Sequence, residues 1–187
     1  MQTKCEVRYI EREDPAALVR YMHEFEVILM VMPLYIHAMP SGVMELIEHM
    51  KLGDFKKQKI GFMIQAGFPE GIHEKCLKGY FEVLTKKLQC EYLGTVVKGN
   101  AAFIYTRPQQ YVKLFEMIKE LGVKFESTGQ FDKQIVDELG QPYQFSKSLL
   151  CVFRVLEKLG IFNYDWKRLL KQNGALEHAL DRPFLDV

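Results

Sequence analysis

Short apolar runs alternate with amphipathic helical patterns along most of this chain, and that alternation limits its fold more than any other feature. Each strand pattern is followed by a segment whose apolar residues recur at helical spacing. The strands are predicted over Lys4–Ile10, Phe25–Ile36, Lys59–Gln65 and Tyr92–Val97. Strands joined by helices of this length form right-handed crossovers, so the chain is predicted to be an α/β fold with a parallel sheet and flanking helices.

The strand boundaries carry further local signals. Phe25–Ile36 is apolar at both alternating sets of positions, which is typical of a central strand covered by helices on each side. Asp14, followed by Pro15, predicts a helix start, and Ser41 is predicted to cap the next helix. Gly122 is placed to close the helix that Pro108 opens.

The pattern changes after residue 122. Residues 129–187 are predicted to be helical, with the strongest segments at Gln144–Leu159 and Tyr164–Gln172. We therefore predict an α/β domain over residues 1–125 and a helical C-terminal extension over residues 126–187. The extension is expected to pack on the sheet, because its apolar positions would otherwise stay unburied.

Charge and cysteine content exclude several classes of function. The 187 residues hold 25 basic and 24 acidic side chains, a net charge of +1, which predicts no nucleic-acid and no membrane partner. No window approaches the roughly 18 apolar residues of a membrane span. Cys5, Cys76, Cys90 and Cys151 form no CxxC pair, so no disulfide framework and no metal site are expected. We expect buried, reduced thiols in a cytoplasmic protein.

Ligands of open parallel sheets bind beyond the carboxyl ends of the strands. The candidate loops are therefore residues 33–41, 65–70 and 98–100. The first contains Pro33-x-Tyr35 followed by Pro40, and this element resembles a loop of flavodoxin-like NADPH-dependent FMN reductases. The segments 60–70 and 94–99 resemble the next strands and loops of that family, so the similarity extends over roughly residues 4–121.

The resemblance implies a flavodoxin-like fold and a function. We expect an oxidoreductase that uses FMN and NAD(P)H to reduce a quinone, a flavin or another small electron acceptor. A homodimer or higher homo-oligomer is expected as well, since such reductases often build flavin sites at subunit interfaces. Hydride transfer is chemistry of the cofactor, so no catalytic side chain is required.

An isoalloxazine ring needs a flat apolar slot and backbone groups along its polar edge. Tyr35, Met39 and Phe68 are the candidates for the slot, and Gly67 permits close approach of the backbone. His37 either touches the ring or is an ordinary loop histidine. The predicted cofactor-binding residues are Pro33, Leu34, Tyr35, His37, Met39, Gln65, Ala66, Gly67, Phe68 and Gly99.

One element of the family pattern is missing. Such reductases begin with a buried strand and a loop rich in Gly, Ser, Thr and Arg that binds the FMN phosphate, and residues 1–24 contain no such loop. The absent strand would lie between the first two strands predicted here, so the fold is N-terminally incomplete. Either Lys4–Ile10 pairs directly with Phe25–Ile36, or another chain fills the gap, or the protein starts upstream, which is the leading expectation. The alternative function is a degenerate flavodoxin-like module without flavin that acts through protein contacts.

Overall fold

The computed structural model describes residues 5–35, 37–67, 75–141, 146–160 and 163–181. The chain divides into two compact units, Met1–Tyr143 and Gln144–Val187, and each is described by itself. In the first unit the elements are η1 (Ile10–Arg12), α1 (Pro15–Met22), β1 (Val27–Pro33), α2 (Ser41–His49), β2 (Lys59–Gln65), α3 (Lys75–Leu88), β3 (Glu91–Lys98), η3 (Pro108–Tyr111), α4 (Val112–Thr128) and α5 (Lys133–Leu139).

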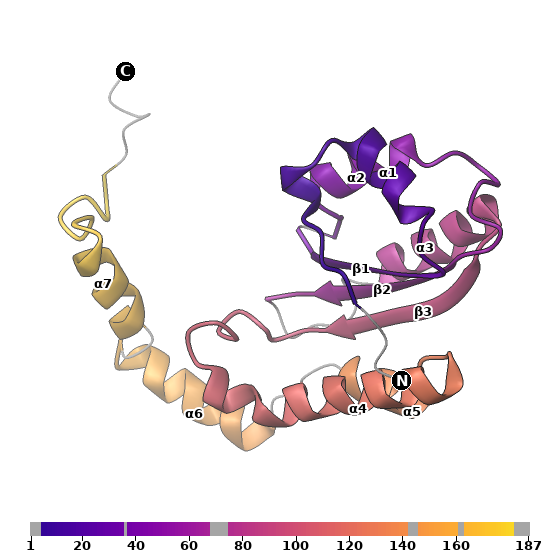
Figure 1. The fold of residues 1–187 in the computed structure, drawn as a ribbon. Helices are drawn as coiled ribbons and strands as arrows, with labels where there is room; N and C mark the ends of the chain where they lie inside the picture. Colours follow the sequence, from indigo (N-terminus) through magenta and orange to yellow (C-terminus); the bar gives the residue numbers. More distant parts are fainter. Residues whose placement is uncertain (1–4, 36, 68–74, 142–145, 161–162, 182–187) are drawn as a thin grey trace. The chain divides into compact units, whose positions relative to one another are not determined.

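The three strands form a parallel sheet in the order β1-β2-β3. Helices α1, α2 and α3 cover one face of this sheet, and α4 and α5 cover the other (Figure 1). We call these the α1–α3 face and the α4–α5 face. The predicted α/β fold with a parallel sheet between two helical layers is therefore confirmed.

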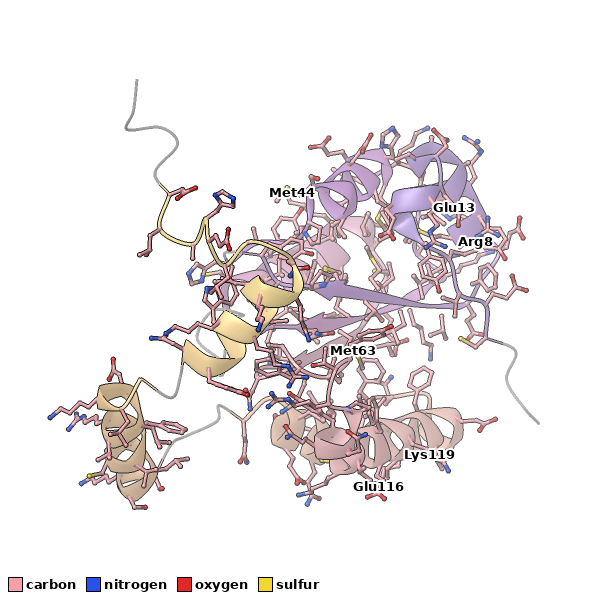
Figure 2. The ribbon with its side chains drawn as sticks, turned by 90° about the vertical axis from the view of Figure 1, so that its left-hand side faces the viewer. Arg8, Glu13, Met44, Met63, Glu116 and Lys119 are labelled. Atoms are coloured by element: carbon pink, nitrogen blue, oxygen red, sulfur yellow. The ribbon has the colours of Figure 1, made fainter. Side chains whose placement is uncertain are left out.

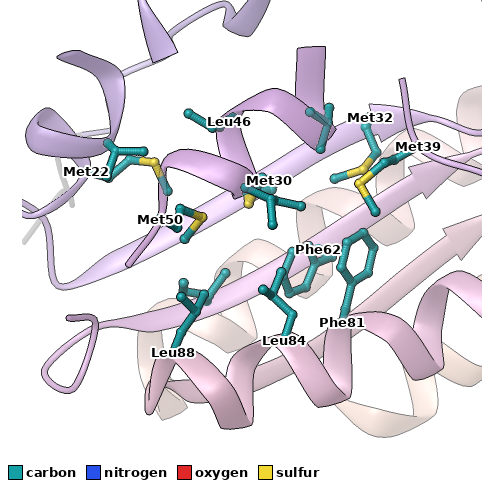
Figure 3. Packing of buried hydrophobic residues seen from close by; sticks show 14 of the residues in the cluster. Met22, Met30, Met32, Met39, Leu46, Met50, Phe62, Phe81, Leu84 and Leu88 are labelled. Atoms are coloured by element: carbon teal, nitrogen blue, oxygen red, sulfur yellow. The ribbon is translucent and has the colours of Figure 1, made fainter. Parts of the chain in front are cut away.

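Methionine and phenylalanine side chains fill the core on the α1–α3 face. Met30 and Met32 of β1 point into it, and Phe62 of β2 stacks on Phe81 of α3 with ring centroids 3.8 Å apart and nearly parallel planes (Figure 3). The two rings are fully buried, and each contributes a large apolar area to the core. Because the unbranched methionines adapt to irregular gaps, they fill the space between strands and helices without a unique shape match.

A second, smaller core lies on the α4–α5 face. Val96 of β3 packs against Leu114, Leu121, Ile135 and Leu139 of the two helices. Met63 of β2 lies on the same side of the sheet, between the strands and α4 (Figure 2). This core is centred on β3 and reaches β2, since the contacts of α5 with the sheet fall on β3.

The helix ends agree with the sequence in part. Asp14 caps α1 by accepting a hydrogen bond from the Ala17 N–H at 2.7 Å, with Pro15 at the first helical position, as predicted. The prediction for Ser41 is wrong: Pro40 is the N-cap of α2 and no side chain caps it. The predicted end at Gly122 is also wrong. Helix α4 continues to Gly129, where φ is +70° and the N–H donates to the Phe125 carbonyl at 2.7 Å.

The predicted first strand, Lys4–Ile10, is wrong within the described residues. Residues 5–9 belong to no sheet, and Ile10 begins the short helix η1. The Arg8 side chain forms a bidentate pair with Glu13 and lies 4.5 Å from the centre of the Tyr21 ring (Figure 2). Tyr21 also donates a hydrogen bond to Glu6. These side chains hold the segment on α1, so it does not become a strand of the sheet.

The predicted strand Phe25–Ile36 forms as the shorter β1, and its predicted central position is wrong. Within the described residues, β1 pairs with β2 alone and lies at the edge of the sheet. Met30 and Met32 are buried, whereas Val27, Leu29 and Val31 on the α4–α5 face are 38%, 48% and 57% exposed. Both faces of the strand are apolar, but α4 and α5 cover only β2 and β3.

Three helices form within the predicted C-terminal extension. Helix α5 packs on β3, and the second unit contains α6 (Lys147–Lys158) and α7 (Asn163–Gln172). The sequence placed the division at residues 125/126, but α4 runs through that position and the compact units divide after residue 143. No helix in the part of the chain that the structure describes is both long and apolar enough to cross a membrane.

Gly61 allows α4 and α5 to approach the sheet, which gives the first prediction. A Cβ at this position of β2 would lie 2.8 Å from the Phe131 ring. We expect Gly61→Val to lower the free energy of unfolding by about 1–3 kcal/mol, because the added side chain displaces that ring. Chemical denaturation measures this, and the Phe131→Ala background should remove much of the loss.

Gly79 provides the matched control. It lies on α3 with nothing within 4 Å of an added Cβ, so Gly79→Ala should raise stability by about 0.5–1 kcal/mol. Equal stability of Gly61→Val and the wild type would contradict the contact between Phe131 and β2.

The cysteines are not the buried thiols that the sequence predicts. Cys5, Cys76 and Cys151 are exposed, and Cys90 is half-buried. All four are free, and their positions on loops and outer helix faces explain the exposure. Burial raises the pKa of Cys90 to about 11, and its thiol donates to the Thr85 carbonyl at 3.6 Å.

This difference predicts the thiol chemistry of the folded protein. Only thiolates react with aromatic disulfides, and at pH 8 a thiol of this pKa is ionised in roughly one molecule per thousand. We expect Cys90 to react far more slowly than the three exposed thiols, and to react faster as the pH rises toward 11. Cys90→Ser should leave the number of fast-reacting thiols unchanged. If that variant has one fast-reacting thiol fewer than the wild type, Cys90 is not the slow thiol.

Candidate functional site

The carboxyl ends of the three strands lie in one row. Pro33 of β1 is opposite Gln65 of β2, and Gln65 is opposite Lys98 of β3. The loops that follow therefore leave the sheet at the same level. Backbone hydrogen bonds join them, from Leu34 N–H to the Gln65 carbonyl at 2.8 Å and from Ala66 N–H to the Lys98 carbonyl at 2.9 Å. The structure thus brings the three predicted loops together at one edge.

The first loop contains a tight turn. Tyr35 and Ala38 exchange two backbone hydrogen bonds, each 2.9 Å long. His37 lies inside this turn in the left-handed region, with φ of +66°. The Tyr35 side chain is 62% exposed beside the turn, so its ring is available to a flat ligand.

The other two loops hold each other. Ala101 N–H donates to the Ala66 carbonyl at 3.0 Å, and both alanines are buried. The Gln65 amide donates to the Ala101 carbonyl at 3.4 Å. Among the described residues, a Cβ added at Gly67 would meet the Ala102 methyl at 3.7 Å, which is ordinary van der Waals contact. Gly67 is itself exposed, and it directly follows the hydrogen-bonded Ala66.

A largely apolar groove of about 420 Å³ begins at this turn and runs between α2 and α3. Its size falls within the usual range of small-molecule pockets. Met39, Leu77 and Tyr80 are among its apolar lining residues, and Glu48 contributes a carboxylate. The complete lining is His37, Ala38, Met39, Met44, Ile47, Glu48, Cys76, Leu77 and Tyr80.

The predicted cofactor-binding residues fall into three groups. One group lies at the row of strand ends and in the loops beyond it, and comprises Pro33, Leu34, Tyr35, His37, Gln65, Ala66, Gly67 and Gly99. Met39 is buried in the core of the α1–α3 face and touches the groove from below. Phe68 lies outside the described residues. Their roles in binding stay predictions.

Lys98 lies in the predicted loop 98–100 but is not among the predicted cofactor-binding residues. It ends β3 next to Gln65, and burial lowers the pKa of its ammonium group below the ordinary value. A titratable group with a shifted pKa at a strand end is a candidate for a ligand-binding role. The signal in the sequence was the position of Lys98 directly after a predicted strand. The rule that ligands bind beyond the carboxyl ends of strands identified Pro33 and Gln65 in the same way.

Metal chemistry finds no support in these residues. Across the stretches of chain that the structure describes, no three His, Cys, Asp or Glu side chains come together in a way that would hold a metal ion. The arrangement instead offers a flat exposed ring, an open glycine, backbone polar groups and one cation. These groups suit a planar organic ligand with a polar edge.

The similarity of this chain to known proteins is low. No protein-family model and no curated protein matches the chain. Among solved structures it is similar to the crystal structure of an NADPH-quinone reductase from P. pentosaceus, with 16% identity and a TM-score of 0.41. The match covers 53% of this chain and 69% of that one. Activity therefore has to be argued from the residues of this chain.

The turn after β3 gives a prediction about the site's backbone. Asn100 has a φ of +56°, and its carbonyl accepts a hydrogen bond from the Tyr111 hydroxyl at 3.1 Å. Asn100→Val should lower the free energy of unfolding by about 1–2 kcal/mol, because β-branched residues resist the left-handed region. Asn100→Gly is the control and should cost little in a denaturant titration. Equal stability of the two variants would contradict the left-handed turn.

Proposed function

We propose that this chain is a flavin-dependent oxidoreductase, in which NAD(P)H reduces bound FMN and the flavin reduces a quinone, a free flavin or another small acceptor. The observation that carries the proposal is the row of strand ends at Pro33, Gln65 and Lys98, whose loops are joined by backbone hydrogen bonds. Parallel sheets bind nucleotide cofactors at this edge.

The ring-binding part of the cofactor is well matched by these loops. The exposed Tyr35 ring offers a stacking surface, and Gly67 leaves room for the ring to approach the backbone. When bound, FMN supplies the hydride chemistry itself, so the protein has only to bind it, orient it and tune it. Lys98 is the residue that we assign to tuning, because a cation beside the polar edge of the ring favours the reduced, anionic flavin.

The phosphate-binding part is not matched. No loop rich in glycine and hydroxyl side chains precedes α1 in the described residues, and the start of that helix is already occupied by the Asp14 carboxylate. A phosphate would be repelled there. Binding by this chain alone is therefore proposed to depend on ring contacts.

The second candidate function is a flavodoxin-like module without flavin that acts through protein contacts. The exposed apolar side chains of β1 favour it, because soluble proteins usually cover such a strand face. The two candidates differ in an observable property, since only the first requires that the protein take up FMN.

Flavin binding is the test of the proposal. Titration of the purified chain with FMN, followed by flavin fluorescence, should show saturable binding. Tyr35→Ala should weaken it by about 1–3 kcal/mol, or roughly 5- to 150-fold, through loss of the stacked ring. Tyr9→Ala is the matched control, because Tyr9 is also an exposed tyrosine and lies outside the three loops.

The outcomes separate the two candidates. A colourless protein that binds no added FMN supports the interaction module and rules out the enzyme for this chain. Saturable binding that responds equally to Tyr35→Ala and Tyr9→Ala would retain the flavin and reject the assigned loop.

A further inference from the structure

The loop that follows β3 is fixed by backbone hydrogen bonds. We call residues 101–107 the β3 loop, which leaves the sheet beyond the end of β3 and turns back toward α4 (Figure 1). The Ala101 N–H ties its start to the loop after β2. Within it, Ile104 N–H donates to the Ala101 carbonyl at 3.2 Å, and Arg107 N–H donates to the Phe103 carbonyl at 2.8 Å. The side chains of the β3 loop therefore project from a hydrogen-bonded turn.

Two aromatic side chains of the β3 loop are exposed. Phe103 is 53% exposed and Tyr105 is 92% exposed, although both rings could bury a large apolar area. Rings on a fixed turn offer stacking surfaces to a planar ligand, and little conformational entropy remains to be lost when that ligand binds. The β3 loop thus provides the aromatic part of a binding site for a flat molecule.

An arginine adds a positive charge to the same turn. The Arg107 guanidinium lies 5.2 Å from the centre of the Phe103 ring, in a cation–π contact. The hydrogen bond from Arg107 N–H to the Phe103 carbonyl sets the two residues one helical turn apart, so the contact follows from the backbone. A guanidinium positioned in this way offers a planar set of N–H donors, which matches the geometry of a phosphate.

The loops at the strand ends contain one lysine, one arginine and no carboxylate in the residues that the structure describes. These residues are 33–35, 37–41, 65–67 and 98–111, and the two cations are Lys98 and Arg107. Burial lowers the pKa of Lys98, and no carboxylate among the described residues counteracts that shift. The whole chain is balanced, with 25 basic and 24 acidic residues, so this positive charge is local. It favours an anionic ligand.

We propose that the β3 loop binds the adenylate half of the pyridine nucleotide, with Tyr105 stacked on the adenine and Arg107, held by Phe103, paired with a phosphate. Adenine is a flat aromatic ring and phosphate is an anion, so one molecule matches both the exposed ring and the cation. Ala102 of the β3 loop lies beside Gly67, which places this nucleotide next to the loops proposed for the flavin.

The identity of the ligand as the pyridine nucleotide rests on the proposed function. The binding of a base and a phosphate rests on the β3 loop alone. The two parts can therefore be tested separately, first with ADP, which carries adenine and phosphates but no nicotinamide, and then with the complete nucleotides.

Calorimetric titration of the purified full chain with ADP, in the absence of FMN, tests the site. The wild type should bind ADP saturably, and NADH or NADPH should displace it. Tyr105→Ala should weaken ADP binding roughly 5- to 150-fold, through loss of base stacking. Arg107→Gln should weaken it roughly 10- to 150-fold, through loss of the charged hydrogen bonds to phosphate. Adenosine has no phosphate, so Arg107→Gln should leave its binding unchanged.

The chain contains a matched control for both variants. The Arg12 guanidinium lies 4.6 Å from the centre of the Tyr9 ring, so the same pairing of cation and ring occurs outside the strand-end loops. Tyr9→Ala and Arg12→Gln should leave the affinity for ADP unchanged. Because all four side chains are exposed, each variant should keep the fold, which far-ultraviolet circular dichroism and melting check.

Four results would overturn the proposal. They are a wild type that binds no ADP, equal losses in Tyr105→Ala and Tyr9→Ala, an Arg107→Gln variant that loses adenosine as much as ADP, and displacement of ADP by FMN. The last would make the β3 loop part of the flavin site. ADP binding by a chain that takes up no FMN would reject the proposed enzyme and support the base-and-phosphate site. FMN binding without ADP binding would reject the β3 loop alone.

Discussion

The parallel hydrogen-bond ladder of β2 with both of its neighbours is the interaction on which the rest of the structure depends. β2 is paired on each edge and packed on each face, with Phe62 buried on one side and Gly61 under the Phe131 ring on the other. Its backbone groups can be satisfied only by β1 and β3. The β2–β3 pairing shifts register between Ile60 and Gly61, and from Gly61 onward both pairings run in step to Pro33, Gln65 and Lys98. The two pairings therefore also fix the level at which all three strands end.

That register accounts for the geometry of the candidate site. Pro33, Gln65 and Lys98 are aligned by the ladder, so the loops beyond them leave the sheet at the same level and can reach one another. The loops then need only short hydrogen bonds and two left-handed residues, His37 and Asn100, to turn back on themselves. The sheet supplies the rigidity of the site, and the loops supply its chemistry.

The features that could be predicted from the sequence are those that a strand or helix determines locally. β2 matches its predicted bounds, and α7 lies within one residue of its predicted start, because periodicity and flanking residues are sufficient there.

The wrong predictions share one physical cause: the sequence of a segment does not show which neighbouring elements will cover it. The apolar pattern of β1 predicts burial on both faces, but it holds no information on whether α4 and α5 reach that strand. Lys4–Ile10 has the alternation of a strand, yet Tyr21 offers its charged residues a better partner than a sheet edge does. Lys98 was missed for a related reason, since its burial depends on the strand beside it.

The candidate site depends directly on β1. The turn at Tyr35 follows this strand, and in the described residues β1 is held by hydrogen bonds to β2 alone, so it opens more easily than a central strand does. Any partner that pairs with Val27, Leu29 and Val31 would hold both edges of β1 and thereby steady the loop that begins at its end. Order in the strand and order in the loop are therefore coupled, because both depend on the same stretch of backbone.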